Sequence, residues 1–265
     1  MSVAEGCDPM LARLKALGFE TAYDYYAQEK KSENFLATGI PELDRGFEGG
    51  LPFGQITEFV GKASVGKTQI CLQCTAKVCL PRSQNGLEGS AVFIDCEGTF
   101  SYDRLKQIYL ANSTFKDESH LQNVLFSRSK DPVELIAAIF QLKEQITRKK
   151  DVKLIVIDSI AHHFRGDDFE SSAQRSHSLT SIMHELQKIS SKWNLAVILT
   201  NQVTTRFCTD GDNGEDGYLA AALGDTYAHM CTNRVFLCFN ERRERIGTVV
   251  KSPMCAEQSF TYKIT

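Results

Sequence analysis

Eight consecutive residues constrain the fold of this chain more than any other segment. They are Gly61, Lys62, Ala63, Ser64, Val65, Gly66, Lys67 and Thr68, which fit the pattern GxxxxGK[ST]. An apolar run at residues 55–60 precedes them, and apolar positions at helical spacing follow over residues 68–78. A strand, a glycine-rich turn and a helix in this order let backbone N–H groups wrap around phosphate groups. The motif therefore predicts an α/β fold with a phosphate-binding loop at the end of a strand.

The rest of the sequence continues this alternation. Apolar and β-branched runs predict strands at residues 55–60, 91–94, 124–126, 154–157, 195–200 and 234–239. Apolar positions at helical spacing predict helices at residues 68–78, 102–111, 132–147 and 175–193. Because the strand runs are apolar on both faces, we expect a mostly parallel central sheet flanked by helices. Residues 247–251 and 260–264 predict antiparallel strands at one edge.

The composition is that of a stable globular protein. Of the 265 residues, 42% are hydrophobic and 24% are charged, and the formal net charge is −3. No run of about 18 apolar residues occurs, and Glu5 and Asp8 stand where a signal peptide carries lysines. The nine cysteines lack a regular framework, so we expect reduced thiols and a location inside the cell. Secreted, membrane-bound and disordered classes are therefore disfavoured.

Carboxylates that follow predicted strands suit the chemistry of a nucleoside triphosphate. Asp158 ends the run at 154–157, where a carboxylate supports Mg²⁺ together with the hydroxyl of Thr68, while Lys67 neutralises the phosphate oxygens. Glu97 follows the run at 91–94 and suits a residue that holds the attacking water. Asp95 competes for this role by position, and the sequence does not separate the two.

Seven stretches spread over nearly the whole chain carry a resemblance. They are 49–52 (GGLP), 66–69 (GKTQ), 93–100 (FIDCEGTF), 195–202 (LAVILTNQ), 203–205 (VTT), 222–224 (ALG) and 251–253 (KSP). Together they resemble the RecA-family ATPases, in the group of eukaryotic strand-exchange recombinases and most of all its C-type paralogue branch. The resemblance implies a RecA-like P-loop ATPase domain over residues 35–265, a linker and oligomerisation arm over residues 1–34, and Mg²⁺-dependent hydrolysis of ATP.

The same resemblance implies roles for individual residues. ATP is bound by the phosphate loop and Gln69, and the guanidinium plane of Arg104 packs against adenine. Lys67, Glu97 and Gln202 form the catalytic set, in which Glu97 orients the hydrolytic water and Gln202 senses the γ-phosphate. The alternative for Gln202 is a strand-end amide that satisfies backbone groups.

Two loops of the family bind DNA and fall here at residues 164–177 and 203–223. The first offers Arg165 and Arg175, and the second offers Arg206. Against Arg206 stand four acidic residues, Asp210, Asp212, Glu215 and Asp216, so the formal charge of the second loop is one minus four, or −3. Acidic side chains oppose the phosphate neutralisation that holds DNA, so we expect contact with single-stranded or branched DNA to be weak without partners. A basic run, Arg242, Arg243 and Arg245, predicts a solvated hairpin tip.

Two segments resemble contacts by which the family assembles. Residues 18–22 (GFETA) are similar to a linker motif that inserts a Phe and an Ala, here Phe19 and Ala22, into the neighbouring ATPase domain. A packing turn between short helices is the alternative. Lys251, Ser252 and Pro253 fall where the family caps the nucleotide of the adjacent subunit, with a lysine in place of an acidic residue. A lysine there suits a cation that reaches the γ-phosphate across the interface.

The sequence thus predicts an ATP-binding and slowly ATP-hydrolysing subunit of a heteromeric complex with other recombinase paralogues. The resemblance implies a nuclear and partly cytoplasmic protein that assists recombinase filaments in homologous-recombination DNA repair. One alternative is an autonomous DNA-dependent ATPase that exchanges strands, against which the acidic loop argues. Another is an interaction scaffold with ATP as structural glue, against which the intact ATPase residues argue.

Overall fold

The computed structural model describes residues 34–114, 117–149, 151–165, 169, 171–207 and 217–264. Eight strands form its central sheet, and each begins and ends within two residues of a predicted run. They are β3 Ile56–Gly61, β4 Ser90–Asp95, β5 Val124–Arg128, β6 Val152–Asp158, β7 Ala196–Asn201, β10 Asn233–Phe239, β11 Arg245–Lys251 and β12 Gln258–Tyr262.

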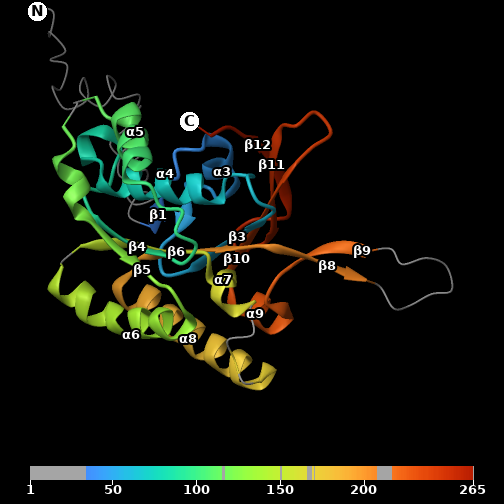
Figure 1. The fold of residues 1–265 in the computed structure, drawn as a ribbon. Coiled ribbons are helices and arrows are strands. Elements are labelled where there is room, and N and C mark those ends of the chain that lie inside the picture. The colour runs from blue at the N-terminus through green and yellow to red at the C-terminus, as the bar shows by residue number, and fades with distance from the viewer. Residues whose placement is uncertain are drawn as a thin grey trace, which may run out of the picture.

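The strands lie in the order β12-β11-β10-β3-β7-β6-β4-β5 (Figure 1). The six from β10 to β5 are parallel, whereas β11 and β12 pair antiparallel with their neighbours. The mostly parallel sheet with an antiparallel edge confirms the predicted fold class. Two short pairs lie outside it: β1 Phe35–Leu36 with β2 Leu51–Pro52, and β8 Val203–Phe207 with β9 Gly217–Ala221. The prediction of a loop at 203–223 was therefore incomplete, because its two ends pair as an antiparallel hairpin.

Helices cover both faces of the sheet (Figure 1). One face carries α3 Pro41–Gly46, α4 Lys67–Cys79 and α5 Tyr102–Asn112. The 3-10 turns η1 Arg82–Gln84 and η2 Ser119–Asn123 follow α4 and α5 in the chain. The other carries α6 Pro132–Arg148, α7 Ile160–Phe164, α8 Ser172–Trp193 and α9 Gly224–Met230. Because α8 begins three residues before the predicted start, Arg175 lies in its first turn and not in a loop.

The strands build two cores because successive side chains point to opposite faces. In β6, Leu154 and Val156 pack with α4 and α5, while Ile155 and Ile157 pack with α6 and α8. All four side chains are fully buried. Truncating any one of them to alanine would cost about 2–5 kcal/mol of stability. None of the helices in the described residues combines the length and apolar content that a membrane span requires.

The topology brings the predicted functional segments to one edge of the sheet. Strands β3, β7, β6 and β4 are neighbours and parallel, so their carboxyl ends meet. The phosphate loop follows β3, Glu97 follows β4, Asp158 ends β6 and Gln202 follows β7. Ligands of open α/β sheets bind at this edge.

Candidate nucleotide site

The loop between β3 and α4 leaves backbone donors open for an anion. Its last glycine, Gly66, is the N-cap of α4 with a φ of 107°, a conformation that L side chains rarely adopt. A Cβ on Gly66 would also lie 2.1 Å from Cδ1 of Ile264. No side chain in the described residues caps α4, and its first turn holds no acidic residue. The N–H groups of that turn therefore remain for phosphate oxygens at the positive end of the helix dipole.

The ammonium of Lys67 lies inside this loop. Its Nζ donates to the carbonyl oxygens of Gly61 at 2.8 Å and Lys62 at 2.9 Å. Burial lowers the pKa of Lys67, while the charges of Glu97 and Asp158 act in the opposite direction. The lysine thus stands between the phosphate loop and two carboxylates, as a phosphate-binding cation requires.

Asp158 has the character of a metal ligand. It is 1% exposed, and its Oδ1 accepts a hydrogen bond from Oγ1 of Thr200 at 2.5 Å. Its Oδ2 is buried and has no hydrogen-bond partner among the described residues. Burial raises the pKa of Asp158, while the nearby hydroxyl groups of Thr200 and Thr68 act in the opposite direction. A buried carboxylate oxygen and a neighbouring hydroxyl are ligands that Mg²⁺ prefers, so Asp158 and Thr68 fit this ion.

The structure separates the two carboxylates that the sequence left in competition. The carboxylate of Asp95 accepts four backbone N–H groups, those of Glu97, Gly98, Thr99 and Phe100, at 2.8–3.2 Å. It is occupied in shaping the turn after β4. Glu97 instead accepts from side chains at the sheet edge, through Oγ of Ser159 at 2.6 Å and Nε2 of Gln202 at 3.0 Å. Glu97 is therefore the carboxylate that faces the site.

Gln202 connects Glu97 to the first predicted DNA loop. Its Nε2 donates to Glu97, and its Oε1 accepts from Nη1 of Arg165, which follows α7. Arg165 therefore binds a side chain of the nucleotide site in this structure. The sequence predicted only a contact of Arg165 with DNA. The sequence also gave no signal for Ser159, apart from its place directly after Asp158.

Arg104 lies beside the helix that follows the phosphate loop. Its Nε donates to Oε1 of Gln69 at 2.8 Å, and its Nη1 donates to Oε1 of Gln107 at 3.3 Å. Gln69 is the third residue of α4, so the guanidinium is held next to the loop. The packing of Arg104 against adenine stays a prediction that this placement allows.

Two side chains from the antiparallel edge of the sheet also hold the phosphate loop by hydrogen bonds. The carbonyl oxygen of Val65 accepts from Nε of Arg245 at 3.2 Å and from the hydroxyl of Tyr262 at 2.8 Å. The prediction of a solvated tip is wrong for Arg245, which lies on β11, whereas Arg242 and Arg243 are exposed in the turn. Both contacts span more than 175 residues of sequence, so no local pattern indicates them.

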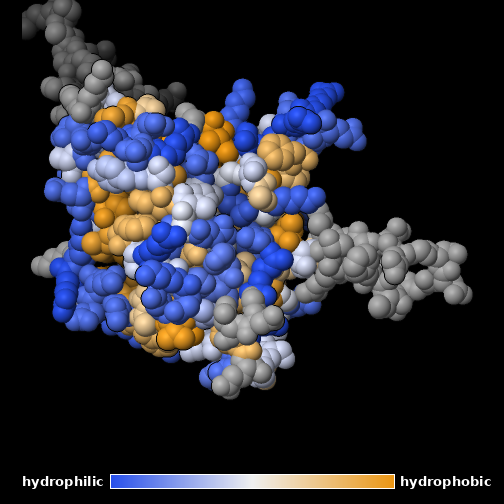
Figure 2. Space-filling view, in the orientation of Figure 1, coloured by the Kyte–Doolittle hydropathy of each residue, from blue (hydrophilic) through white to orange (hydrophobic). Residues whose placement is uncertain are grey.

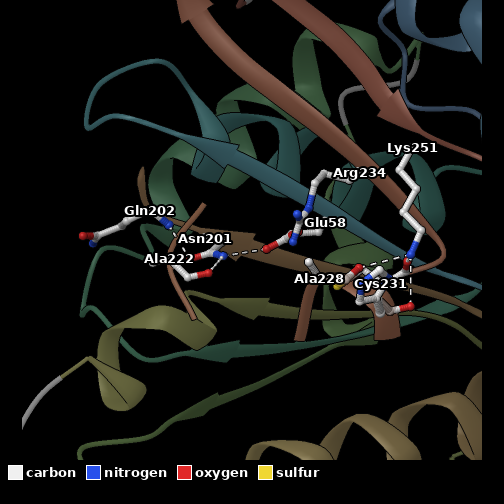
Figure 3. A network of polar contacts seen from close by, with 9 residues as sticks. Glu58, Asn201, Gln202, Ala222, Ala228, Cys231, Arg234 and Lys251 are labelled. Carbon is white, nitrogen blue, oxygen red and sulfur yellow. Dashed lines mark hydrogen bonds and ion pairs between the residues drawn. The ribbon is translucent and has the colours of Figure 1, made fainter. Parts of the chain in front are cut away.

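The predicted cap segment is folded onto its own chain (Figure 3). Nζ of Lys251 donates to the carbonyl oxygens of Ala228 at 3.1 Å, His229 at 3.0 Å and Cys231 at 2.7 Å, at the end of α9. Oγ of Ser252 donates to Oδ1 of Asn233 at 2.9 Å, and Pro253 is exposed. A contact of Lys251 with a neighbouring nucleotide stays a prediction.

Some predicted residues are not placed. Phe19 and Ala22 lie outside the described residues, as do the arm up to residue 33 and the acidic residues of the second loop. Arg206 is placed on β8 by its backbone alone.

The model of the Rad51 family matches residues 30–265. The chain is 33% identical over 265 residues to "DNA repair protein RAD51 homolog 3" of Cricetulus griseus, covering 92% of this chain and 70% of that protein. It is 33% identical over 250 residues to the protein of the same description in Dictyostelium discoideum, covering 88% and 64%. It is 33% identical over 251 residues to "DNA repair and recombination protein RadA" of Aeropyrum pernix, covering 94% and 76%.

Proposed function

The chain belongs to the Rad51 family, and from this premise we propose that it is an ATP-binding, slowly ATP-hydrolysing subunit of a heteromeric complex of recombinase paralogues. The observation that carries the proposal is the meeting of Lys67, Glu97 and Asp158 at one sheet edge, beside an uncapped helix N-terminus. The names of the relatives support a role in homologous-recombination DNA repair, for which we propose a nuclear and partly cytoplasmic protein.

The residues at this edge would divide the work of hydrolysis. The first turn of α4 and Lys67 would bind the β and γ phosphates of ATP. Mg²⁺, held by Thr68 and Asp158, would neutralise charge that develops on the phosphate oxygens. Glu97, with one oxygen already held by Ser159 and Gln202, would orient the attacking water with the other. A carboxylate held by two donors is preorganised but weakened as a base, which suits slow turnover.

The chain of contacts from Arg165 through Gln202 to Glu97 supports a coupling to DNA. Arg165 follows α7 and precedes the first predicted DNA loop, and its guanidinium binds the amide of Gln202. A DNA phosphate competes for the same guanidinium. DNA binding at this loop would therefore free the amide of Gln202 and change how it holds Glu97.

The outer edge of the sheet supports assembly with a second subunit. Among the described strands, β5 pairs with β4 alone, so its other side offers backbone donors and acceptors. A hollow of about 410 Å³ lies beside it, lined by Val92, Phe126 and Arg148, among others. Phe126 is 49% exposed, and Figure 2 shows apolar surface between hydrophilic patches on the side where β4 and β5 lie. An added strand with an aromatic anchor, such as Phe19 supplies, fits such an edge.

Light scattering with ATP and Mg²⁺ tests the proposal, on this chain alone and mixed with a second Rad51-family protein. We expect a small particle alone and a discrete ATP-dependent complex in the mixture. Phe19→Glu should abolish or strongly weaken that complex, whereas Tyr26→Glu, an equal change on the same arm outside the motif, should preserve it. Long polymers of the chain alone on DNA that Phe19→Glu dissolves would contradict the heteromeric role and favour an autonomous recombinase.

A further inference from the structure

A buried carboxylate in the phosphate strand has no part in the site described above. Glu58 of β3 is 0% exposed and lies opposite Arg234 in the register of β3 with β10. Its Oε2 accepts from Nε of Arg234 at 2.5 Å. Burial raises the pKa of Glu58, and the Arg234 charge opposes that shift. Two apolar residues would avoid the desolvation cost of a buried ion pair, so stability alone does not explain this one.

The second oxygen of Glu58 reaches the end of β7. Its Oε1 accepts from Nδ2 of Asn201 at 2.6 Å. The same nitrogen donates to the carbonyl oxygen of Ala222 at 2.9 Å, and Oδ1 of Asn201 accepts the N–H of Gln202 at 2.7 Å. One buried amide thus joins three segments of the chain (Figure 3).

These contacts fix the backbone of Gln202 on both sides. Its N–H is held by Asn201, and its carbonyl oxygen accepts the N–H of Ala222 at 2.9 Å. Gln202 leads into β8 and Ala222 follows β9, so both ends of the hairpin are tied to Glu58 through one side chain. From this fixed backbone, the side chain of Gln202 reaches Glu97.

We propose that Glu58 and Asn201 are positioning residues that aim Gln202 at Glu97 and attach both ends of the β8–β9 hairpin to the phosphate strand. Glu58 lies three residues before the phosphate loop begins, so the strand that carries the nucleotide also carries the anchor of the hairpin. Neither residue is among those that the proposed function assigns to ATP or Mg²⁺. The inference rests on the proposed ATPase function for its kinetic consequence, but its structural content does not depend on turnover.

Glu58→Gln is the main test, because it keeps the shape of the side chain and places an amide N–H against the donors of Arg234 or Asn201. The matched control is Asp44→Asn in α3. Asp44 is a partly buried carboxylate whose pKa, like that of the fully buried Glu58, is raised by burial, and it accepts from Thr38 and Gly39 away from the nucleotide edge. If Glu58→Gln does not fold, Asn201→Ser carries the test, since it leaves Glu58 with Arg234 and removes only the bridging amide.

Two measurements are made on the full chain. In ATP turnover, we expect Glu58→Gln to lower kcat about tenfold with KM changed less than about twofold, and Asp44→Asn to change neither. In hydrogen exchange, we expect the amides of Gln202 and Ala222 to exchange about tenfold faster in Glu58→Gln and at the wild-type rate in Asp44→Asn.

The possible outcomes distinguish failure of the positioning role of Glu58 from failure of the proposed ATPase function. Wild-type exchange at Gln202 and Ala222 in Glu58→Gln would overturn the inference, as would an equal loss of kcat in Asp44→Asn. A wild-type chain without ATP turnover would refute the proposed function, and the hydrogen-exchange arm would still decide whether Glu58 fixes the hairpin.

Discussion

Two acidic residues at the carboxyl end of β4, Asp95 and Glu97, have different roles because their carboxylate oxygens accept from different donors. The carboxylate of Asp95 receives backbone N–H groups of the next turn, and that of Glu97 receives side chains from β6 and β7 segments. The role of each carboxylate therefore follows from the hydrogen-bond donors around it and not from its position in the sequence motif.

Exchanging each carboxylate for its amide should separate these roles. Glu97→Gln should lower ATP turnover about 10²–10⁴-fold and leave the melting temperature nearly unchanged, because it removes the water-orienting charge. Asp95→Asn should cost about 1–3 kcal/mol of stability, because a charged acceptor of several N–H groups is lost. Thermal melts and single-turnover hydrolysis check both. If both variants are folded at the assay temperature and lose turnover equally, the assignment of Glu97 as the water-orienting carboxylate is contradicted.

Asp158→Asn tests the metal site through stability. Because burial raises the pKa of Asp158, the folded chain holds its proton more tightly than the unfolded chain, and the ionised form opposes folding at neutral pH. We expect the metal-free variant to melt at or above the wild-type temperature at about pH 7.5, with the difference shrinking as the pH falls through the raised pKa.

The same variant should lose its response to ligand. At about a hundredfold excess over Kd, Mg–ATP stabilises a binding protein by about 2.7 kcal/mol, or about 5–10 °C for a domain of this size. Scanning fluorimetry should show this gain in the wild type and not in Asp158→Asn. If Asp158→Asn keeps the full rise in melting temperature with Mg–ATP, Asp158 is not a ligand of the metal.

Residues in contiguous motifs could be predicted, and residues joined by tertiary contacts could not. Lys67 and Thr68 follow from the spacing of one loop. The bond from Ser159 to Glu97 spans 62 residues, and that from Arg245 to Val65 spans 180, so only the folded sheet brings them together.

Long helices and the apolar strands of the central sheet were predicted within a few residues, whereas short helices and the β8–β9 hairpin were missed. Helix α6 shows its apolar face over 17 residues, whereas α7 has five residues and too little length for a period. The hairpin of β8 and β9 depends on pairing across the second predicted DNA loop, which local propensity does not report. This is why Arg206 lies on a strand and not in a loop.

The end of α9 offers a test at the scale of an element. Lys251 places its ammonium on three carbonyl oxygens there, where a cation complements the helix dipole. Lys251→Met should therefore cost about 1 kcal/mol, or about 2–4 °C in melting temperature. Lys263→Met, at an exposed lysine on the same edge, is the control and should melt like the wild type. Equal melting of the two variants would show that the contacts of Lys251 add nothing to stability.

At the scale of the whole molecule, the order of strands creates the site. The sequence indicated the strands of the central sheet, but not that β7 lies between β3 and β6, which brings Gln202 beside Glu97. The same order leaves β5 at one edge, where a second subunit can add a strand. The edge proposed to bind the nucleotide and the edge proposed for assembly thus belong to one sheet.

The central claim is that this sheet edge binds Mg–ATP through Lys67. Calorimetric titration of the chain with ATP and Mg²⁺ measures it directly, on the wild type, on Lys67→Ala and on Lys188→Ala, which removes an exposed lysine from α8 on the opposite face. We predict one Mg²⁺-dependent ATP per chain, affinity at least about tenfold weaker in Lys67→Ala, and wild-type affinity in Lys188→Ala. No binding by the wild type, or binding that Lys67→Ala leaves unchanged, would contradict the account.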